Sequence, residues 1–504
     1  MIKSLMHNML ISALAFFTIS VVGLLLVPIL ISTYGIHGFG LISIARLFLP
    51  LAALAILDIG FGEIATHSVA TARVDSDWKR CSRILLINIV SAVMIGLVAG
   101  ILLWVLTPHI GVWMKVPSAD WVTLSSVLYL TAVLLPIFFS SLVFEGVLKG
   151  YENFAMQRLS ELISTLTYAA MVILVAHLEL GLEWVCYSFL LSLLIRFSFA
   201  TMIAIHHLKR NGVSISLWMK EDSWWFGGRA KVMSQNKILG AIQSSAPSLL
   251  IGTLIGPTGL GLYEALSRMP KFAKSVFGLL NSTIQPVAVR LESMVDDKNI
   301  SRLGRLGLQL MATIIASFLG ALVSMSEPIL RLWLGASVAP YWKWQAVYFI
   351  VPALSSLVGL GGSALLARKH AIEKMNRIGA LYLSLVLLVG IVAIDALQER
   401  AFIAAQVIAI IVTFPIQMNL IRREMNIDTI AYVVLVKIFS VAIIMSIPTI
   451  WVATYIDSIP VLLTALVSWI VTCWAICASF AIEPQQRTQI LQKLMQNWNA
   501  GWKK

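Results

Sequence analysis

The chain alternates between long apolar runs and short polar segments along its whole length. An apolar run of about 20 residues is long enough to cross the hydrocarbon core of a bilayer as an α-helix. The pattern therefore predicts an all-α polytopic membrane protein with about 14 transmembrane helices, or 12 if the less distinct runs within 159–205 and after 429 are counted differently. The predicted spans are 9–31, 39–60, 83–106, 122–143, 159–178, 184–205, 237–256, 258–289, 306–325, 344–365, 377–395, 401–420, 429–453 and 460–482.

The composition agrees with a membrane protein. The chain has 504 residues, of which 59% are hydrophobic and 12% charged, and its mean hydropathy is +0.89. A soluble protein carries about twice that charged fraction. The first apolar run, 9–31, is longer than the core of a secretory signal peptide and has no small-residue cleavage site after it. We therefore expect it to remain as the first span.

Basic residues are distributed very unequally between the two sides of this predicted topology. Membrane proteins carry an excess of Lys and Arg in their cytoplasmic loops. With the N-terminus placed inside, 27 of the 37 Lys and Arg residues fall on the inner side and four on the outer side, namely Lys115, Arg331, Lys343 and Arg400. We therefore expect both termini to be cytoplasmic. The same bias accounts for the net charge of +13, so nucleic-acid binding is not needed to explain it.

A glycine-rich motif occurs twice in the chain. GIHGFGL at 35–41 and GPTGLGL at 256–262 both read GxxGxGL, 221 residues apart, and an arginine follows each of them, Arg46 or Arg268. The motifs are either ordinary glycine-rich turns or the trace of a duplication. Because six predicted spans separate them, a duplication implies two six-helix lobes with the same orientation in the membrane.

This repeat suggests a division of the chain into five parts. Tryptophans among cations in the inter-lobe loop and in the tail predict segments that lie on the membrane surface. The predicted parts are an N-terminal six-helix lobe at 1–205, a cytoplasmic inter-lobe loop at 206–236, a C-terminal six-helix lobe at 237–420, helices 13 and 14 at 421–482, and a cytoplasmic tail at 483–504.

The predicted span at 258–289 carries charges deep in the membrane. Counted from its start, Arg268 lies roughly 13 Å and Lys274 roughly 22 Å along the helix. At about 100° per residue, Glu264, Arg268 and Lys271 fall on one face with Lys274 beside them. Charges inside the membrane usually face a bundle interior or a wet cavity, so this positive face predicts a site for an anion. The alternative, an i,i+4 ion pair that satisfies itself, leaves both lysines unexplained.

Further charged residues extend this hypothesis. Arg46, Arg196 and Lys437 also fall inside predicted spans. If they face one central cleft together with the cations of 258–289, that cleft fits phosphate or pyrophosphate, with Arg binding bidentately and Lys acting as a point charge.

Motion of the charged helix and its coupling to an ion also have candidates in the sequence. Pro270 interrupts the backbone hydrogen bonding of the charged helix and is a candidate hinge. Glu264, Asp58 and Asp395 are the candidate carboxylates for coupling transport to an ion gradient.

The sequence contains no constellation typical of an enzyme. The predicted outer loops are short, and there is no paired-carboxylate loop, G-x-S-x-G, HExxH, P-loop or metal-spaced His/Cys set. We therefore expect no enzymatic activity, no cofactor and no metal. The cysteines have no metal-ligand neighbours and do not suggest a disulfide framework; they are Cys81, Cys186, Cys473 and Cys477.

Two stretches resemble a known family. Residues 26–67 contain a proline-bearing first helix, a Y-x-G-x-x-x-[FY]-G-L-like turn and the sequence Asp58-Ile59-Gly60-Phe61-Gly62, and residues 259–272 read GLGLYEALSRMPKF. Both are similar to the polysaccharide transporter family, the Wzx-type O-antigen flippases. Phe61 stands where that family usually has a small aliphatic residue, and His67 stands where it commonly has an arginine.

The resemblance implies the fold of the multidrug/oligosaccharidyl-lipid/polysaccharide exporter superfamily. It also implies a flippase for an undecaprenyl-pyrophosphate-linked oligosaccharide, an O-antigen or other surface polysaccharide repeat unit, in the bacterial inner membrane. Its partners would be that lipid-linked oligosaccharide, membrane lipid and a polysaccharide polymerase. The alternatives are a lipid II flippase, a drug/ion antiporter, which would need an acidic cleft, and a membrane-embedded polymerase or ligase, which would need a large outer loop.

Overall fold

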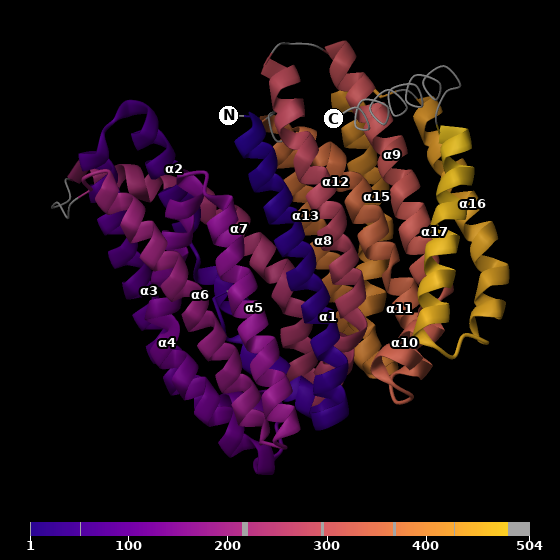
Figure 1. Cartoon of the computed structure of the whole chain (residues 1–504), viewed down its shortest axis with the longest axis horizontal. Helices are drawn as coiled ribbons and strands as arrows, with labels where there is room; N and C mark the ends of the chain where they lie inside the picture. Colours follow the sequence, from indigo (N-terminus) through magenta and orange to yellow (C-terminus); the bar gives the residue numbers. More distant parts are fainter. Residues whose placement is uncertain are drawn as a thin grey trace, which may run out of the picture. The chain divides into compact units, whose positions relative to one another are not determined.

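The computed structural model of the chain is built from α-helices, most of them long (Figure 1). It describes residues 2–50, 52–213, 220–293, 297–365, 369–427 and 429–481. Within these ranges, ten helices are long and apolar enough to cross a membrane. The prediction of an all-α polytopic membrane protein is confirmed. The ambiguous segment 159–205 forms two helices, α5 (Phe154–His177) and α6 (Leu182–Arg210).

The helices group into two compact units. The first unit contains Met1–Arg268 and Val386–Ala405, and the second contains Met269–Leu385 and Gln406–Lys504. The boundary inside the helix α8 (Pro257–Ser293) therefore falls between Arg268 and Met269. These bounds differ from those of the predicted lobes, and the division into two superposable six-helix lobes stays a prediction.

The first unit is a bundle of long helices. α3 packs against α4, α4 packs against α2 and α6, and α5 packs against α1 and α6; α3 and α4 lie side by side in Figure 1. Its elements, besides α5, α6 and the start of α8, are α1 (Ile2–Leu47), η1 (Ala53–Leu57), α2 (Phe61–Asp75), α3 (Trp78–Trp113), α4 (Ser118–Gly150), α7 (Lys220–Leu254), the end of α13, α14 (Ile394–Leu397), η3 (Gln398–Arg400) and the start of α15.

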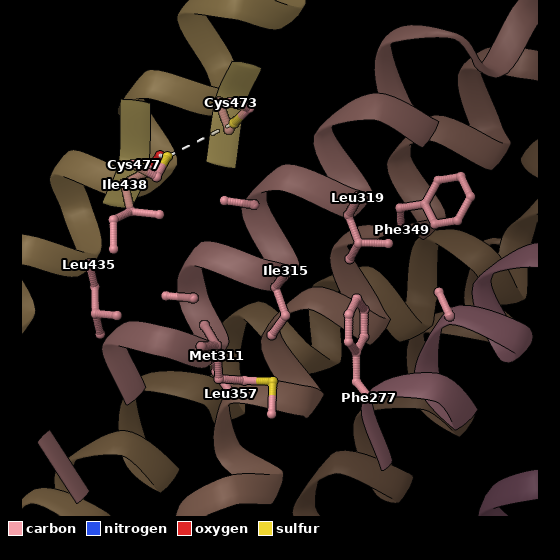
Figure 2. Packing of buried hydrophobic residues seen from close by; sticks show 14 of the residues in the cluster. Phe277, Met311, Ile315, Leu319, Phe349, Leu357, Leu435, Ile438, Cys473 and Cys477 are labelled. Atoms are coloured by element: carbon pink, nitrogen blue, oxygen red, sulfur yellow. Dashed lines mark hydrogen bonds between the residues drawn. The ribbon is translucent and has the colours of Figure 1, made fainter. Parts of the chain in front are cut away.

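The second unit is organised around α9 (Asp297–Ser324), which packs against α12, α16 and α17. Figure 2 shows Ile315 and Leu319 of α9 in its apolar core, with Cys473 and Cys477 on α17 at one side. All four cysteines of the chain are buried and free. The remaining elements are α10 (Ser326–Leu334), η2 (Ala339–Tyr341), α11 (Trp342–Tyr348), α12 (Ile350–Leu365), α13 (Lys369–Val392), α15 (Ala401–Met425), α16 (Thr429–Ala453) and α17 (Ile459–Ala481).

The second predicted span, 39–60, is interrupted in the structure. The α-helix ends at Leu47, a short 3₁₀ helix follows, and α2 begins at Phe61. The carboxylate of Asp58 causes this restart, because its Oδ1 accepts hydrogen bonds from the backbone N–H groups of Gly60 (2.9 Å) and Phe61 (3.0 Å). Its Oδ2 lies 2.6 Å from Nζ of Lys237 on α7. This candidate coupling residue therefore caps α2 and ties it to α7.

The predicted inter-lobe loop at 206–236 is largely helical. α6 continues to Arg210 and α7 begins at Lys220, while 214–219 and the predicted tail at 483–504 lie outside the described residues. Asp222 of α7 is buried and pairs with Nε of Arg83 at 2.6 Å. Ion pairing and apolar contacts thus hold the start of α7 against α2 and α3.

The two copies of the GxxGxGL motif touch each other at equivalent positions. Nδ1 of His37 lies 3.0 Å from Oγ1 of Thr258, and these residues are 221 positions apart, the offset of the repeat. Gly40 and Gly261 are also 221 positions apart, and they pack backbone against backbone. Residues that contact their own counterparts are the signature of a two-fold relation. The two turns are therefore related by a local two-fold pseudo-axis.

The backbone of the two turns agrees with this relation. Gly35 and Gly256 occupy equivalent positions, and both have a positive φ, 69° and 108°. A side chain at either position would be strained, because this region of φ favours glycine. The first glycine of each motif therefore has a positive φ in common, in addition to the shared sequence.

We expect Gly40→Ala to lower the thermal stability of the protein. A Cβ at this position would clash with the backbone carbonyl of Pro257, which cannot rotate away, and overpacking of this kind costs about 1–3 kcal/mol. Gly240→Ala on α7 is the matched control, because a Cβ there meets open space. The melting temperatures of both variants in detergent test the contact. Equal melting temperatures would show that the turns do not pack rigidly.

Acidification should destabilise the corner between α2 and α7 through His67. Burial, and then the charge of Arg229, lower the pKa of His67 below its ordinary value, and Arg229 donates a hydrogen bond to its Nε2 at 2.9 Å. A histidine with a lowered folded-state pKa takes up its proton more readily when unfolded. Stability is therefore lost as the pH falls below about 6.5.

We expect His67→Gln to reduce the drop in melting temperature between pH 7 and pH 5. His177→Gln is the control, since His177 is exposed at the end of α5. The same drop in the wild type and in both variants would contradict the assignment to His67.

Candidate functional site

Three arginines line one cavity within the first unit, here called the arginine cavity. It has a volume of about 290 Å³, and residues of α1, α5 and α6 form its wall together with Arg268 of α8. Its charged lining residues are Arg46, Arg196, Arg268 and Glu161. Three arginines against one glutamate leave a formal excess of two positive charges. The structure thus brings together three of the six cations that the sequence analysis proposed for one cleft.

Arg46 reaches the cavity from the last turn of α1. The carbonyl end of a helix favours a cation at this position. Its guanidinium lies over the rings of Tyr168 (5.1 Å) and Phe189 (4.3 Å) and donates a hydrogen bond to the Tyr168 hydroxyl. Its Nε is buried and has no hydrogen-bond partner among the described residues. The aromatic rings hold Arg46 in place without neutralising its charge.

Arg268 enters the cavity from α8. Its Nη2 lies 4.0 Å from the carboxylate of Glu264, and Glu264 also accepts a hydrogen bond from the Ser248 hydroxyl at 2.6 Å. The Nε of Arg268 is buried and, within the described ranges, lacks a hydrogen-bond acceptor. The i,i+4 pair proposed from the sequence is therefore present but long, and it leaves hydrogen-bonding capacity on Arg268.

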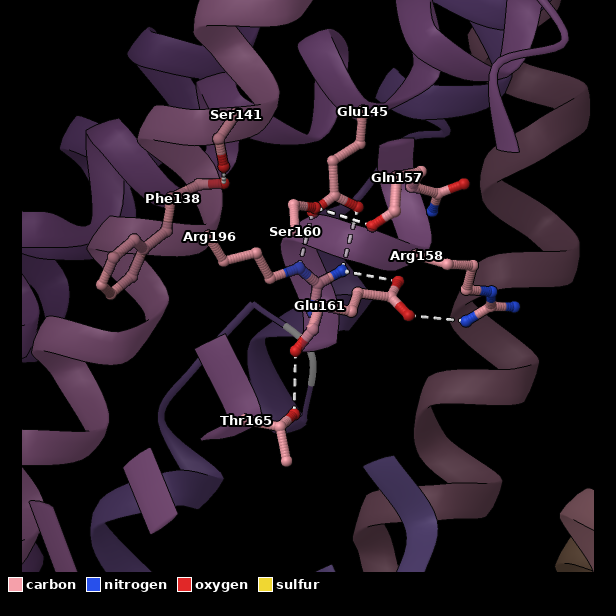
Figure 3. Close-up of polar contacts among 9 residues, drawn as sticks. All are labelled: Phe138, Ser141, Glu145, Gln157, Arg158, Ser160, Glu161, Thr165 and Arg196. Carbon is pink, nitrogen blue, oxygen red and sulfur yellow. Dashed lines mark hydrogen bonds and ion pairs between the residues drawn. The ribbon is translucent and has the colours of Figure 1, made fainter. Parts of the chain in front are cut away.

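Arg196 is the neutralised member of the three. Its Nε and Nη2 bind both carboxylate oxygens of Glu145 at 2.9 and 3.1 Å, and Nη2 also binds Glu161 at 3.2 Å. Glu161 in turn accepts from Arg158 at 2.6 Å. Figure 3 shows this network of two arginines and two glutamates, drawn from α4, α5 and α6. The Arg196 and Glu145 side chains are only 16% and 7% exposed, so the network acts as a buried bridge between helices.

The other predicted site residues lie elsewhere. Lys271 and Lys274 on α8 and Lys437 on α16 belong to the second unit, and all three side chains are exposed. Pro270 lies within α8, two residues beyond the boundary between the units. Asp395 is exposed on the short helix α14. The membership of the three lysines in an anion site stays a prediction.

The two carboxylates that pair with Arg196, those of Glu145 and Glu161, were not predicted from the sequence. Glu161 falls inside the predicted span 159–178, and Glu145 lies two residues beyond the predicted end of 122–143. The available signal was physical, because an arginine at membrane depth needs a partner and a carboxylate in a neighbouring span is the obvious one. Tyr168 gave no such signal, since a tyrosine in a span is equally typical of helix packing.

The family of the chain can be established from its sequence. Residues 35–343 match the family described as polysaccharide biosynthesis protein. The chain belongs to this family. No curated protein is similar enough in sequence to count as a match.

Solved structures with the same fold are membrane transporters. One is the lipid II flippase MurJ in its inward closed conformation, with 14% identity, coverage of 93% of this chain and 98% of that chain, and a TM-score of 0.71. Another is an inward-facing multidrug resistance MATE family transporter of the MOP superfamily, with 12% identity, coverage of 82% and 98%, and a TM-score of 0.68. At these identities the likeness shows that this family member shares their fold.

Glu145→Gln should lower the yield of folded protein, because the buried guanidinium of Arg196 then keeps only one of its two carboxylate partners, Glu161. Breaking a buried ion pair costs about 3–5 kcal/mol. Arg158→Gln is the control at the half-buried end of the same network and should cost much less, since the Arg158 side chain is 34% exposed and that of Glu145 is 7% exposed. Size-exclusion profiles and melting temperatures of the membrane-extracted variants measure both effects. A wild-type profile for Glu145→Gln would show that the bridge is dispensable.

Proposed function

We propose that the protein is a flippase for an undecaprenyl-pyrophosphate-linked oligosaccharide, an O-antigen or other surface polysaccharide repeat unit, in the bacterial inner membrane. The observation that carries this proposal is the pair Arg46 and Arg268. Each presents a buried Nε that lacks a hydrogen-bond partner in the described structure, in a cavity with an excess of positive charge. Guanidinium groups of this kind bind phosphate through charge-assisted hydrogen bonds. The polysaccharide biosynthesis family supports the same class of substrate.

The size of the cavity limits what it binds. A volume of about 290 Å³ lies at the lower end of ligand pockets, which measure roughly 300–1,000 Å³. The cavity therefore suits a diphosphate and an adjoining sugar rather than a whole repeat unit. The rest of the saccharide and the polyprenyl tail lie outside it, with the tail remaining in lipid.

Transport proceeds by alternating access in this proposal. Pro270, the candidate hinge of the charged helix α8, lies next to the boundary between the compact units. Glu264 is the preferred coupling carboxylate, because it lies beside a cavity arginine, whereas Asp58 caps α2 and Asp395 is exposed. An ion gradient, the membrane potential or consumption of the product outside drives the direction. Both termini lie in the cytoplasm.

The positive cavity argues against export of cationic drugs. A cation entering beside Arg46 and Arg268 meets like charges, and like-charge contact at low dielectric is costly. A lipid II flippase remains a related alternative, because its substrate also carries a pyrophosphate.

We expect Arg46→Ala and Arg268→Ala each to reduce surface polysaccharide export at least 10-fold. Both variants should still reach the membrane at the normal level. Within the described ranges neither arginine forms an ion pair shorter than 4.0 Å, so its removal should not unfold the protein. Arg268→Lys should keep partial activity if the site reads net charge, and lose it if bidentate geometry matters. Export of labelled glycan from cells, normalised to membrane protein, is the measurement.

Glu264→Gln distinguishes a structural role of the Glu264–Arg268 pair on α8 from a role in coupling. A purely structural pair should cost folded protein and leave specific activity intact, whereas a coupling role should reduce the activity of fully folded protein. Normal export by both alanine variants would refute the arginine cavity as the substrate site.

A further inference from the structure

A second hollow, larger than the arginine cavity, lies between α4 and α6 in the first unit. This α4/α6 groove has a volume of about 650 Å³. Apolar side chains such as Ile137 and Met202 form much of its wall, and these two are 49% and 62% exposed. Exposed apolar side chains on a transmembrane helix face lipid. The groove therefore opens on the lipid-facing side of these helices.

The groove is distinct from the arginine cavity. Arg196 and Phe197 are neighbours on α6, yet Arg196 lines the cavity and Phe197 lines the groove. Successive residues of a helix point about 100° apart, so α6 presents a different face to each space. The bridge from Arg196 to Glu145 lies on the cavity side.

One end of the groove is basic. His206 and Lys209, in the last turns of α6, line it there, and the positive-inside pattern predicts this end to be cytoplasmic. Along α6 the groove runs from Phe197 to Lys209, which is about 18 Å at 1.5 Å per residue. Half of a bilayer core is about 15 Å thick. The groove therefore has the length of one leaflet, with Lys209 at the level of the headgroups.

The part of the groove next to its basic end is apolar. Met202 and Ile205 of α6 line it directly before His206 and Lys209, whereas the hydroxyls of Ser198 and Thr201 lie farther from that end. The order toward the end of α6 is therefore apolar and then basic, which matches the acyl chain and the phosphate of a phospholipid.

We propose that the α4/α6 groove is a binding site for an anionic phospholipid of the cytoplasmic leaflet. The acyl chain lies along the apolar wall, and the phosphate binds His206 and Lys209. Basic pockets between transmembrane helices on the cytoplasmic side bind anionic headgroups in this manner. A second copy docked symmetrically through this groove fits it poorly, because the contact would bring the two Lys209 residues of like charge together. This site is independent of the transported substrate.

Lipid titration of the purified full-length protein, followed by native mass spectrometry, tests the site. The probes are dioleoyl phosphatidylglycerol and dioleoyl phosphatidylcholine. We expect wild-type protein to prefer phosphatidylglycerol and the double variant His206→Ala, Lys209→Glu to bind it about 10-fold more weakly. Lys149→Glu is the matched control, because Lys149 ends α4 on the same side but does not line the groove; it should bind as the wild type does.

A variant that fills the groove without changing its charge provides a second test if the charge variants fold poorly. Ser198→Trp places bulk in the groove at an exposed position and should weaken binding of phosphatidylglycerol without a change in charge. Four results would overturn the proposal: equal phosphatidylglycerol binding by the variants and the wild type, equal binding of the two phospholipids by the wild type, displacement of phosphatidylglycerol by a tighter-binding polyprenyl phosphate, or a change in oligomeric state instead of lipid binding. Activity in export is not used, so the test does not depend on the proposed transport function.

Discussion

The bidentate ion pair between Arg196 and Glu145 is the interaction on which the first unit depends. An arginine in a membrane-spanning helix needs a partner, since an uncompensated charge at the bilayer centre costs at least 2.5–3.5 kcal/mol on insertion scales. Glu145 supplies that partner from α4 and Glu161 from α5, so three helices are joined at one point. The bridge also fixes the wall of the arginine cavity, because Arg196 and Glu161 both line it.

The same bridge sorts the arginines into two roles. Arg196 is satisfied by carboxylates, whereas Arg46 rests on aromatic rings and Arg268 has only a distant carboxylate. A cavity whose cations were all paired would have no net attraction for an anion. In the proposed function, the two arginines without a short ion pair are therefore the ones that bind the anion.

More of the fold than of the candidate site could be predicted from the sequence. Run length and hydropathy were enough to place the helices, because spanning a bilayer imposes a length on each of them. They failed at 39–60, where Asp58 captures two backbone N–H groups and restarts the helix as α2. They also failed at Lys220, where pairing of Asp222 with Arg83 makes a helix out of an expected loop. The first failure arises from a local carboxylate cap and the second from a long-range ion pair, and a count of apolar residues contains neither.

Helical periodicity likewise identified Arg268 as facing a polar interior, but not which cations would share that interior with it. Residue identity alone does not distinguish a charge that is neutralised by a neighbouring helix from one that is free. Glu161 illustrates this limit. In the sequence it is one carboxylate in an apolar span, and its role as a bridge is visible only from its contacts with Arg196 and Arg158, which lie 35 and three positions away.

The duplicated turn explains why Arg46 and Arg268 meet. Gly40 and Gly261 pack against each other, and a helix leaves the contact from each of them. Arg46 lies six residues beyond Gly40 and Arg268 seven residues beyond Gly261, which is about 9 and 10.5 Å along the respective helices. Two helices that start from one contact and carry an arginine at nearly equal distances bring both side chains to the same depth. Both arginines thus line one cavity, and in the proposed function they bind the two phosphoryl groups of a diphosphate.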